Sequence, residues 1–174
     1  MIMDNSLETY IEMAMELGAE HAICVRTDRI FFDSRTYLKC MYGCHGGLPE
    51  TLCSSQPGRI KPWEYEEMLK RYEYSLLLHF TPQKGRIAQK VALAVESKAF
   101  TDGYYFAFTL CDCDLCVDCF RFKGKECAFP LKARPSMHGA GIDVFKTVHS
   151  FGLPLETLSS PDEERNSYAL IFFE

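Results

Sequence analysis

The residues of this chain best suited to chemistry are its cysteines, because seven of the nine fall into two groups. In the second group three thiols stand at i, i+3 and i+6, and a fourth follows after seven intervening residues. Such close neighbours cannot easily bridge one another, since a disulfide needs particular Cα separations and side-chain directions, but they can turn inward together on one loop. The spacing therefore predicts a metal site. The two groups are Cys40, Cys44 and Cys53, and Cys113, Cys116, Cys119 and Cys127.

The second group contains the C-x2-C-x2-C core with which bacterial ferredoxins hold three corners of a cubane 4Fe–4S cluster. In those ferredoxins three residues and a Cys-Pro pair complete the run, whereas here seven residues precede Cys127 and Pro130 follows it by three. A structural zinc site usually takes two C-x2–4-C pairs, so Cys113 and Cys116 would supply one pair. A third cysteine at the same interval favours an iron–sulfur cluster, with zinc as the alternative.

The first group lies in a stretch rich in glycine and proline, from residue 40 to residue 61, which needs something to organise it. It predicts either a second cluster or a site shared with the second group. Seven cysteines are one ligand short of two all-cysteine cubanes. The missing eighth ligand would be His45 or Asp114, or that iron would stay open to an exogenous ligand. Cys127 would be a ligand of either the first or the second group.

The two remaining cysteines are interpreted as bystanders, that is, as residues that bind no metal. Cys24 lies in a strand pattern and would pack as a small hydrophobic side chain, and Cys111 would point away from the second group. Among the histidines, only His138 stands close to the second group and is a candidate for a role at the site. The patterns around His21, His79 and His149 indicate core or surface residues.

Composition limits the class of protein. The formal net charge is −5, which argues against nucleic-acid binding. The nearest basic cluster would instead offset the charge of a thiolate-ligated centre or dock an acidic redox partner. The first residues lack the basic and apolar regions of a signal peptide, and the apolar runs are too short to span a bilayer, so a cytoplasmic protein without membrane segments is expected. The basic cluster is Lys123, Lys125, Lys132 and Arg134.

Segments with helix and strand patterns alternate along the chain, which predicts an α/β fold. We expect one metal-binding domain over residues 1–174, with a mixed sheet of about four to five strands, flanking helices, and cysteine-rich loops at 40–61 and 111–135 that leave strand ends. The unit from 74 to 110 predicts a right-handed parallel crossover. Helices are expected at about 6–17, 62–71, 83–100 and 143–150, and strands at 21–32 (one strand or a hairpin), 74–80, 104–110 and 168–173.

Several further stretches accompany the cysteines: Met41-Tyr-Gly43, Gly103-Tyr-Tyr-Phe-Ala-Phe108, Glu126-Cys127 and the run Ala133-Arg-Pro-Ser-Met-His-Gly-Ala-Gly-Ile-Asp-Val-Phe-Lys-Thr147. Together with the seven cysteines they resemble the prokaryotic predicted metal-binding proteins grouped as domain of unknown function 2284. The resemblance covers nearly the whole chain. It implies that all seven grouped cysteines are metal ligands and that the protein belongs mainly to anaerobic bacteria and archaea, and it implies no activity.

Two positions depart from that family's pattern. Members usually have two prolines after the third cysteine, where this chain has Ser54-Ser55, and a glutamate is often found where His138 stands. The first departure would loosen the N-terminal loop, and the second would put a potential metal ligand in place of an acid.

These observations favour an iron–sulfur protein with one or two 4Fe–4S clusters that acts in electron transfer or as a redox accessory, with a redox protein as its partner. An enzyme that uses an open cluster iron as a Lewis acid is the second hypothesis. A zinc-stabilised structural or interaction module is the third.

Overall fold

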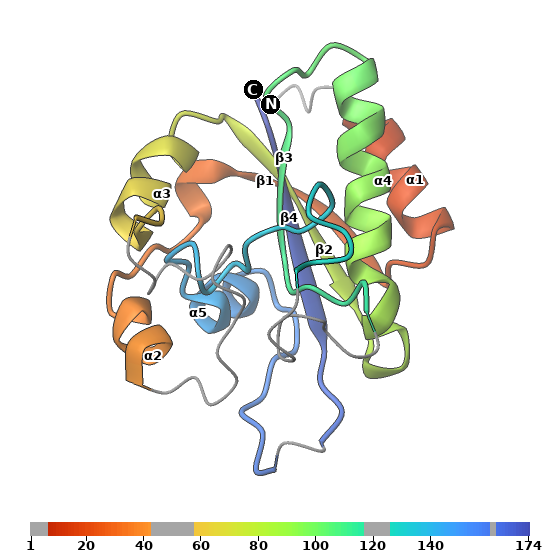
Figure 1. Cartoon of the computed structure of the whole chain (residues 1–174). Helices are drawn as coiled ribbons and strands as arrows, with labels where there is room; N and C mark the ends of the chain where they lie inside the picture. Colours follow the sequence, from red (N-terminus) through yellow and green to blue (C-terminus); the bar gives the residue numbers. More distant parts are fainter. Residues whose placement is uncertain (1–6, 43–57, 117–125, 161–162) are drawn as a thin grey trace.

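A four-stranded sheet forms the centre of the computed structural model, which describes residues 7–42, 58–116, 126–160 and 163–174. Its strands lie in the order β1-β2-β4-β3, and every neighbouring pair is antiparallel (Figure 1). The predicted α/β class is confirmed, while the neighbouring strands are antiparallel throughout rather than mixed. The strands are β1 (His21–Arg26), β2 (Tyr74–Phe80), β3 (Phe108–Cys111) and β4 (Ser167–Phe173).

The predicted crossover from residue 74 to residue 110 is present in a modified form. Strands β2 and β3 are joined through helix α4 (Ala88–Thr101), and both run antiparallel to β4. They are therefore parallel to each other, as expected for a strand–helix–strand unit. The last strand of the chain, β4, lies between them, a position that local sequence patterns do not reveal.

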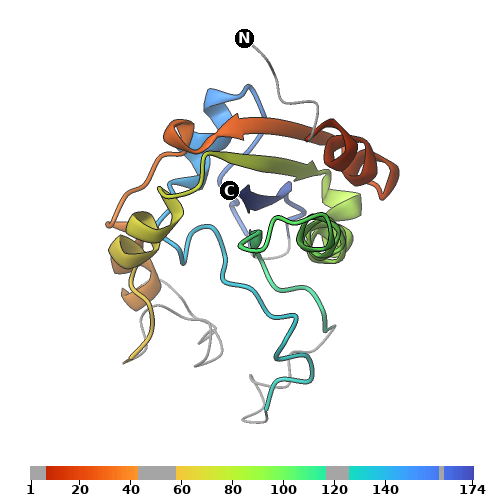
Figure 2. The ribbon, with the colours of Figure 1, turned by 90° about the horizontal axis from the view of Figure 1, so that it is seen from above.

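The two faces of the sheet are covered by different helices (Figure 2). Helix α1 (Glu8–Glu16) and α4 pack on one face, where Ala14, Ala92 and Val95 are buried in a common core cluster. Helices α3 (Pro62–Leu69) and α5 (Val144–Ser150) contribute Leu69 and Val148 to a second cluster on the opposite face. Because both faces are covered, the central strands can be apolar without alternation.

The central strand β2 illustrates this two-sided burial. Leu76 and Leu78 face α1 and α4, Leu77 faces the other way, and all three side chains are fully buried. His79 belongs to the same face as Leu77, since successive strand residues point to opposite sides. Only 2% of its surface is exposed, so this strand places an ionisable ring inside the protein.

Several expected boundaries differ from the observed ones. The segment 21–32 forms β1 and a short 3-10 helix, η1 (Thr27–Arg29), after which Phe32 makes a single antiparallel bridge to Ile142. A second 3-10 helix, η2 (Pro82–Ile87), precedes α4, and β3 begins at Phe108, later than the expected residue 104. The remaining helices and strands lie close to their predicted ranges.

The first cysteine loop does not begin as predicted. Residues 40–42 are the last turn of helix α2 (Thr36–Tyr42), so this loop follows a helix and not a strand end. Residues 43–57 and 117–125, which include Cys44, Cys53 and Cys119, lie outside the described residues. In the described part of the chain, no helix combines the length and the apolar character that a membrane crossing requires.

Candidate metal centre

Strand β3 delivers the chain to the second cysteine group. Its last residue, Cys111, donates its backbone N–H to the carbonyl oxygen of Pro135 at 3.0 Å, so the two ends of the loop 111–135 lie side by side. The Cys111 side chain points into the core under α4 and is 1% exposed. Burial raises the pKa of this thiol above its ordinary value, because the thiolate would lose its hydration. Cys111 is therefore buried in the core, and it also lines the cavity that the cysteines of the second group share.

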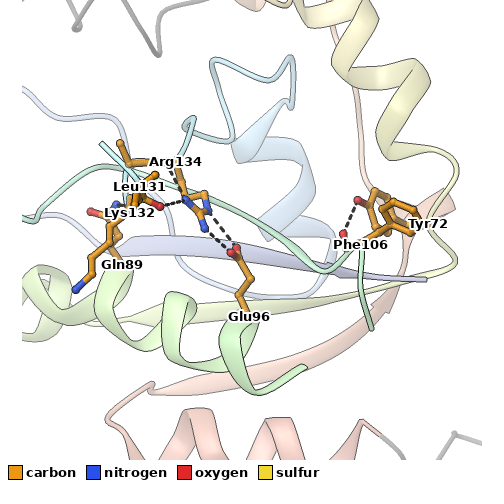
Figure 3. A network of polar contacts seen from close by, with 8 residues as sticks. Tyr72, Gln89, Glu96, Phe106, Leu131, Lys132 and Arg134 are labelled. Atoms are coloured by element: carbon orange, nitrogen blue, oxygen red, sulfur yellow. Dashed lines mark hydrogen bonds and ion pairs between the residues drawn. The ribbon is translucent and has the colours of Figure 1, made fainter. Parts of the chain in front are cut away.

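A glutamine of α4 holds both arms of this loop, the outgoing arm at residues 111–116 and the returning arm at residues 126–135. The side-chain oxygen of Gln89 accepts a hydrogen bond from the backbone N–H of Asp114 at 2.8 Å. Its side-chain nitrogen donates to the carbonyl oxygen of Lys132 at 3.0 Å (Figure 3). Gln89 is fully buried, so these two bonds form away from water and satisfy both ends of its amide. One helix side chain thus fixes the arm before Cys116 relative to the arm after Cys127.

A second anchor joins the returning arm to the same helix. The guanidinium of Arg134 donates from Nε to Glu96 at 3.2 Å and from Nη2 to the other oxygen of the same carboxylate (Figure 3). Its Nη1 donates to the carbonyl oxygens of Leu131 and Ala133 at 3.1 and 3.0 Å. The two charged side chains are only 17% and 13% exposed. The charge of Arg134 is therefore balanced by Glu96, and its main role in the structure is to fold the returning arm.

Three of the grouped thiols open onto one cavity of about 640 Å³. Cys113 and Cys116 come from the outgoing arm, and Cys127 comes from the returning arm. Asp114 and His138, which sequence reasoning named as candidates near the site, line the same cavity. Cys113 is exposed, whereas Cys116 and Cys127 are half-buried. The fold thus brings Cys127 to the same cavity as the first two cysteines of its run.

Residues just before β4 and at its start also line the cavity. Arg165, Asn166 and Tyr168 all line it, and Arg165 donates to the carboxylate of Asp112 at 3.1 Å. Burial raises the pKa of Tyr168 to about 12, and its hydroxyl donates to the carbonyl oxygen of Pro154. The cavity lining therefore contains thiols together with the guanidinium of Arg165 and the amide of Asn166.

Of the other predicted ligands, only Cys40 is among the described residues. Cys40 lies half-buried on α2 and is not among the lining residues. Cys44, Cys53, Cys119 and His45 fall outside the described residues. Within the described ranges, no three His, Cys, Asp or Glu side chains are close enough together to hold a metal ion.

The donor set nevertheless fits a soft metal centre. Thiolates are the ligands of iron–sulfur clusters and of structural zinc, and hard cations such as magnesium prefer oxygen. Cys113, Cys116 and Cys127 line one cavity, with Asp114 as an oxygen donor beside them. The residues that would hold the metal are thus the three thiols, together with Cys119 from the same run.

The cysteine and histidines outside the two groups have structural contacts. Cys24 on β1 is half-buried against the α1 and α4 core, as predicted. His149 of α5 is paired through Nε2 with the carbonyl oxygen of Leu155 at 2.9 Å. His21 and His79, which sequence reasoning treated as ordinary core or surface residues, are hydrogen-bonded to each other at 2.9 Å.

Sequence reasoning missed Gln89 and Asn166. Gln89 directly follows Ala88, the first residue of the apolar helix stripe, and a buried amide at that place must be hydrogen-bonded. This position beside the apolar stripe is the one sequence signal that could have identified Gln89. Asn166 lies in a polar stretch before the last strand, and only the cross-strand register brings it to His79.

Comparison with known proteins supports a metal-binding role. No match to this chain was found among the curated proteins or among the solved structures. One family model matches residues 24–173, a range that includes all of the sheet except the first residues of β1. It also includes all seven grouped cysteines. The chain therefore belongs to the family described as predicted metal-binding protein (DUF2284).

Proposed function

We propose that the protein is an iron–sulfur protein whose loop 111–135 holds a 4Fe–4S cluster through Cys113, Cys116, Cys119 and Cys127. The observation that supports this most directly is that Cys113, Cys116 and Cys127 line one cavity, although ten residues lie between Cys116 and Cys127 along the chain. Two arms anchored to α4 by Gln89 hold them there. Three thiols at intervals of three are the ligand pattern of a cubane cluster and exceed what one zinc pair needs.

Electron transfer is the role we favour for this cluster. When bound, such a cluster would take up and release single electrons. The exposure of Cys113 supports this role, because an exposed ligand would bring the centre close to a docked redox protein. Four thiolates would also leave no iron of this cluster open.

A specific observation favours a second candidate, an enzyme that acts on a small molecule beside the cluster. The cavity of about 640 Å³ lies within the range of small-molecule sites, roughly 300 to 1,000 Å³. The first group, Cys40, Cys44 and Cys53, supplies only three thiols. A cluster held by that group would have one iron open to a small molecule, although Cys40 does not line this cavity.

Optical spectroscopy of anaerobically purified protein tests the cluster itself. We expect a brown protein whose broad visible absorption bleaches on reduction, because iron–thiolate and iron–sulfide bonds absorb visible light and zinc does not. Cys127→Ser should lose much of this absorption, whereas the matched variant Cys24→Ser should keep it, because Cys24 does not line the cavity. A colourless wild-type protein that contains zinc would support the zinc-stabilised module instead.

Electron paramagnetic resonance of the reduced protein distinguishes the two roles. Cyanide or a small thiol should leave the spectrum unchanged if every iron is held by protein ligands, as expected for electron transfer. A shifted spectrum would show an open iron. If that shift were lost in Cys40→Ser but kept in Cys127→Ser, the open iron would belong to the first group.

A further inference from the structure

A row of side chains crosses the sheet from its exposed edge to the cysteine-lined cavity. The strand register pairs His21 with His79, and His79 with Tyr168. Their rings stack in sequence, with centroids 5.2 Å apart for the two histidines and 5.0 Å apart for His79 and Tyr168. His21 is exposed on the edge strand β1, His79 is buried, and Tyr168 lines the cavity. The row therefore connects the surface to the cavity wall.

The hydrogen bonds along this row indicate which ring nitrogens carry protons. His79 Nε2 lies 2.8 Å from the side-chain oxygen of Asn166, and His79 Nδ1 lies 2.9 Å from Nδ1 of His21. An amide oxygen only accepts, so Nε2 of His79 carries a proton and donates. In a neutral imidazole the other nitrogen then accepts, so the proton between the two rings belongs to His21. In this arrangement a hydrogen bond from the buried ring holds the Asn166 amide with its oxygen toward His79.

The orientation of Asn166 determines what the cavity wall offers. Its oxygen is occupied by His79, so the NH₂ group is the polar end that remains for a ligand. The neighbouring Arg165 also lines the cavity and uses Nη2 to bond Asp112, with further N–H groups on the same guanidinium. This part of the wall presents donors, and it selects a ligand that accepts hydrogen bonds.

The rest of the lining narrows the class of ligand. Asp112, Asp114 and Glu156 also line the cavity and disfavour a ligand with several negative charges. Apolar side chains such as Phe129, Val144 and Leu155 surround the remaining space and suit an apolar body. A single carboxylate on a small apolar molecule satisfies both conditions.

We propose that Arg165 and Asn166 bind the carboxylate of a small apolar monocarboxylic acid in this cavity, and that His79, held by His21, is a positioning residue for Asn166. The inference rests on the proposed function only in placing this ligand beside the cluster. The binding contacts themselves come from protein side chains and need no metal. The bidentate fork of an arginine beside an amide donor is suited to a carboxylate.

Isothermal titration calorimetry on the anaerobically purified full chain tests the proposal, with iron and zinc measured on the same sample. The probes are phenylacetate, its neutral analogue phenylacetamide, and succinate. Phenylacetate should bind, while phenylacetamide and succinate should bind at least tenfold more weakly. Absence of phenylacetate binding, or equal binding of succinate, would overturn the proposal.

Asn166→Asp is the sharpest variant, because the carboxylate keeps an oxygen for His79 and replaces the donor with an acceptor. Phenylacetate should bind about tenfold to a hundredfold more weakly. Gln83→Glu is the matched control, since Gln83 is exposed and does not line the cavity. Its affinity should equal that of the wild type, and unchanged affinity in Asn166→Asp would refute a role for Asn166.

His79→Phe tests positioning, because phenylalanine keeps a ring against Tyr168 and loses the bond to Asn166. The preference for phenylacetate over phenylacetamide should shrink, since the amide of Asn166 is then no longer held in one orientation. Equal weakening of both probes would show a purely structural role and would refute this part of the proposal. Phenylacetate binding to a zinc-containing, iron-free protein would leave this site standing and refute the cluster.

Discussion

Gln89 accepts a hydrogen bond from the backbone N–H of Asp114 at 2.8 Å, which ties a fully buried side chain of α4 to the residue directly after Cys113. The same amide donates to the carbonyl oxygen of Lys132 on the returning arm. The cysteine loop is therefore set by a helix that precedes it in the sequence and that carries no metal ligand. This arrangement separates the residues that would hold a metal from the residue that positions them.

Gln89→Leu tests this relationship. Leucine has a similar size but leaves the N–H of Asp114 and the carbonyl of Lys132 without their partner. We expect the free energy of unfolding to fall by about 1–3 kcal/mol, and the iron retained after gel filtration to fall as well. Gln83→Leu is the control, since Gln83 is exposed and bonds only Glu164 among the described residues. Full iron retention in Gln89→Leu would contradict a positioning role.

The ion pair between Glu96 and Arg134 should contribute more to the free energy of unfolding than an exposed ion pair does. Glu96→Gln leaves the guanidinium of Arg134, which is only 17% exposed, without its counter-charge. A loss of about 1–3 kcal/mol is expected in urea denaturation. The comparison is Glu73→Gln, which removes one of the two carboxylates paired with Arg26, in a pair with both side chains more than half exposed. This change should cost about 0.5 kcal/mol or less. Equal losses would contradict the anchoring role of Arg134.

The nine thiols should separate into ligands and bystanders. Cys116→Ser should lose metal and also stability, because metal binding to this loop would be coupled to its folding. Cys24→Ala should keep its metal and be only mildly destabilised, since Cys24 is a half-buried side chain packed on the core. Metal analysis and thermal denaturation of both variants provide the check. If the two variants lost equal amounts of iron, the division into seven ligands and two bystanders would be wrong.

Tyr168 should make stability depend on alkaline pH. Its folded-state pKa is about 12 against an ordinary value of 10.0, so the buried neutral phenol is favoured by folding. The stabilisation is fully present below pH 10 and is lost as the pH rises through about 12. Over this pH interval the free energy of unfolding of the wild type, measured by urea denaturation, should therefore fall by about 2 kcal/mol more than that of Tyr168→Phe. Parallel stability curves for the two proteins would contradict a raised pKa.

Much of the fold could be predicted from the sequence because its signals are local. The apolar run from Tyr74 to Phe80 and the stripe from Ala88 to Ala99 each fall within one element of the structure. The place of β4 between β2 and β3 could not be predicted, since it depends on pairing between distant segments. Helix α2 was also missed, because glycines and prolines beyond residue 42 dominated the pattern around Cys40.

The sequence predicts ligands for the candidate site but not the residues that support them. Regular spacing marks Cys113 and Cys116 as a pair, and the structure adds that Cys127 lines the same cavity. The contacts of Gln89 and Asn166 depend on tertiary packing and register, so no spacing rule indicates them. The sequence thus predicts the donors, and the fold shows which side chains hold the loop that carries them.

Quantitation of iron, acid-labile sulfide and zinc in anaerobically purified protein tests the central claim most directly. The proposed cluster in loop 111–135 predicts about four irons and about four sulfides per chain, and about eight of each if the first cysteine group holds a second cubane. Cys113→Ser should lose about four irons, whereas Cys24→Ser should lose none. Stoichiometric zinc without acid-labile sulfide in the wild-type protein would contradict the account.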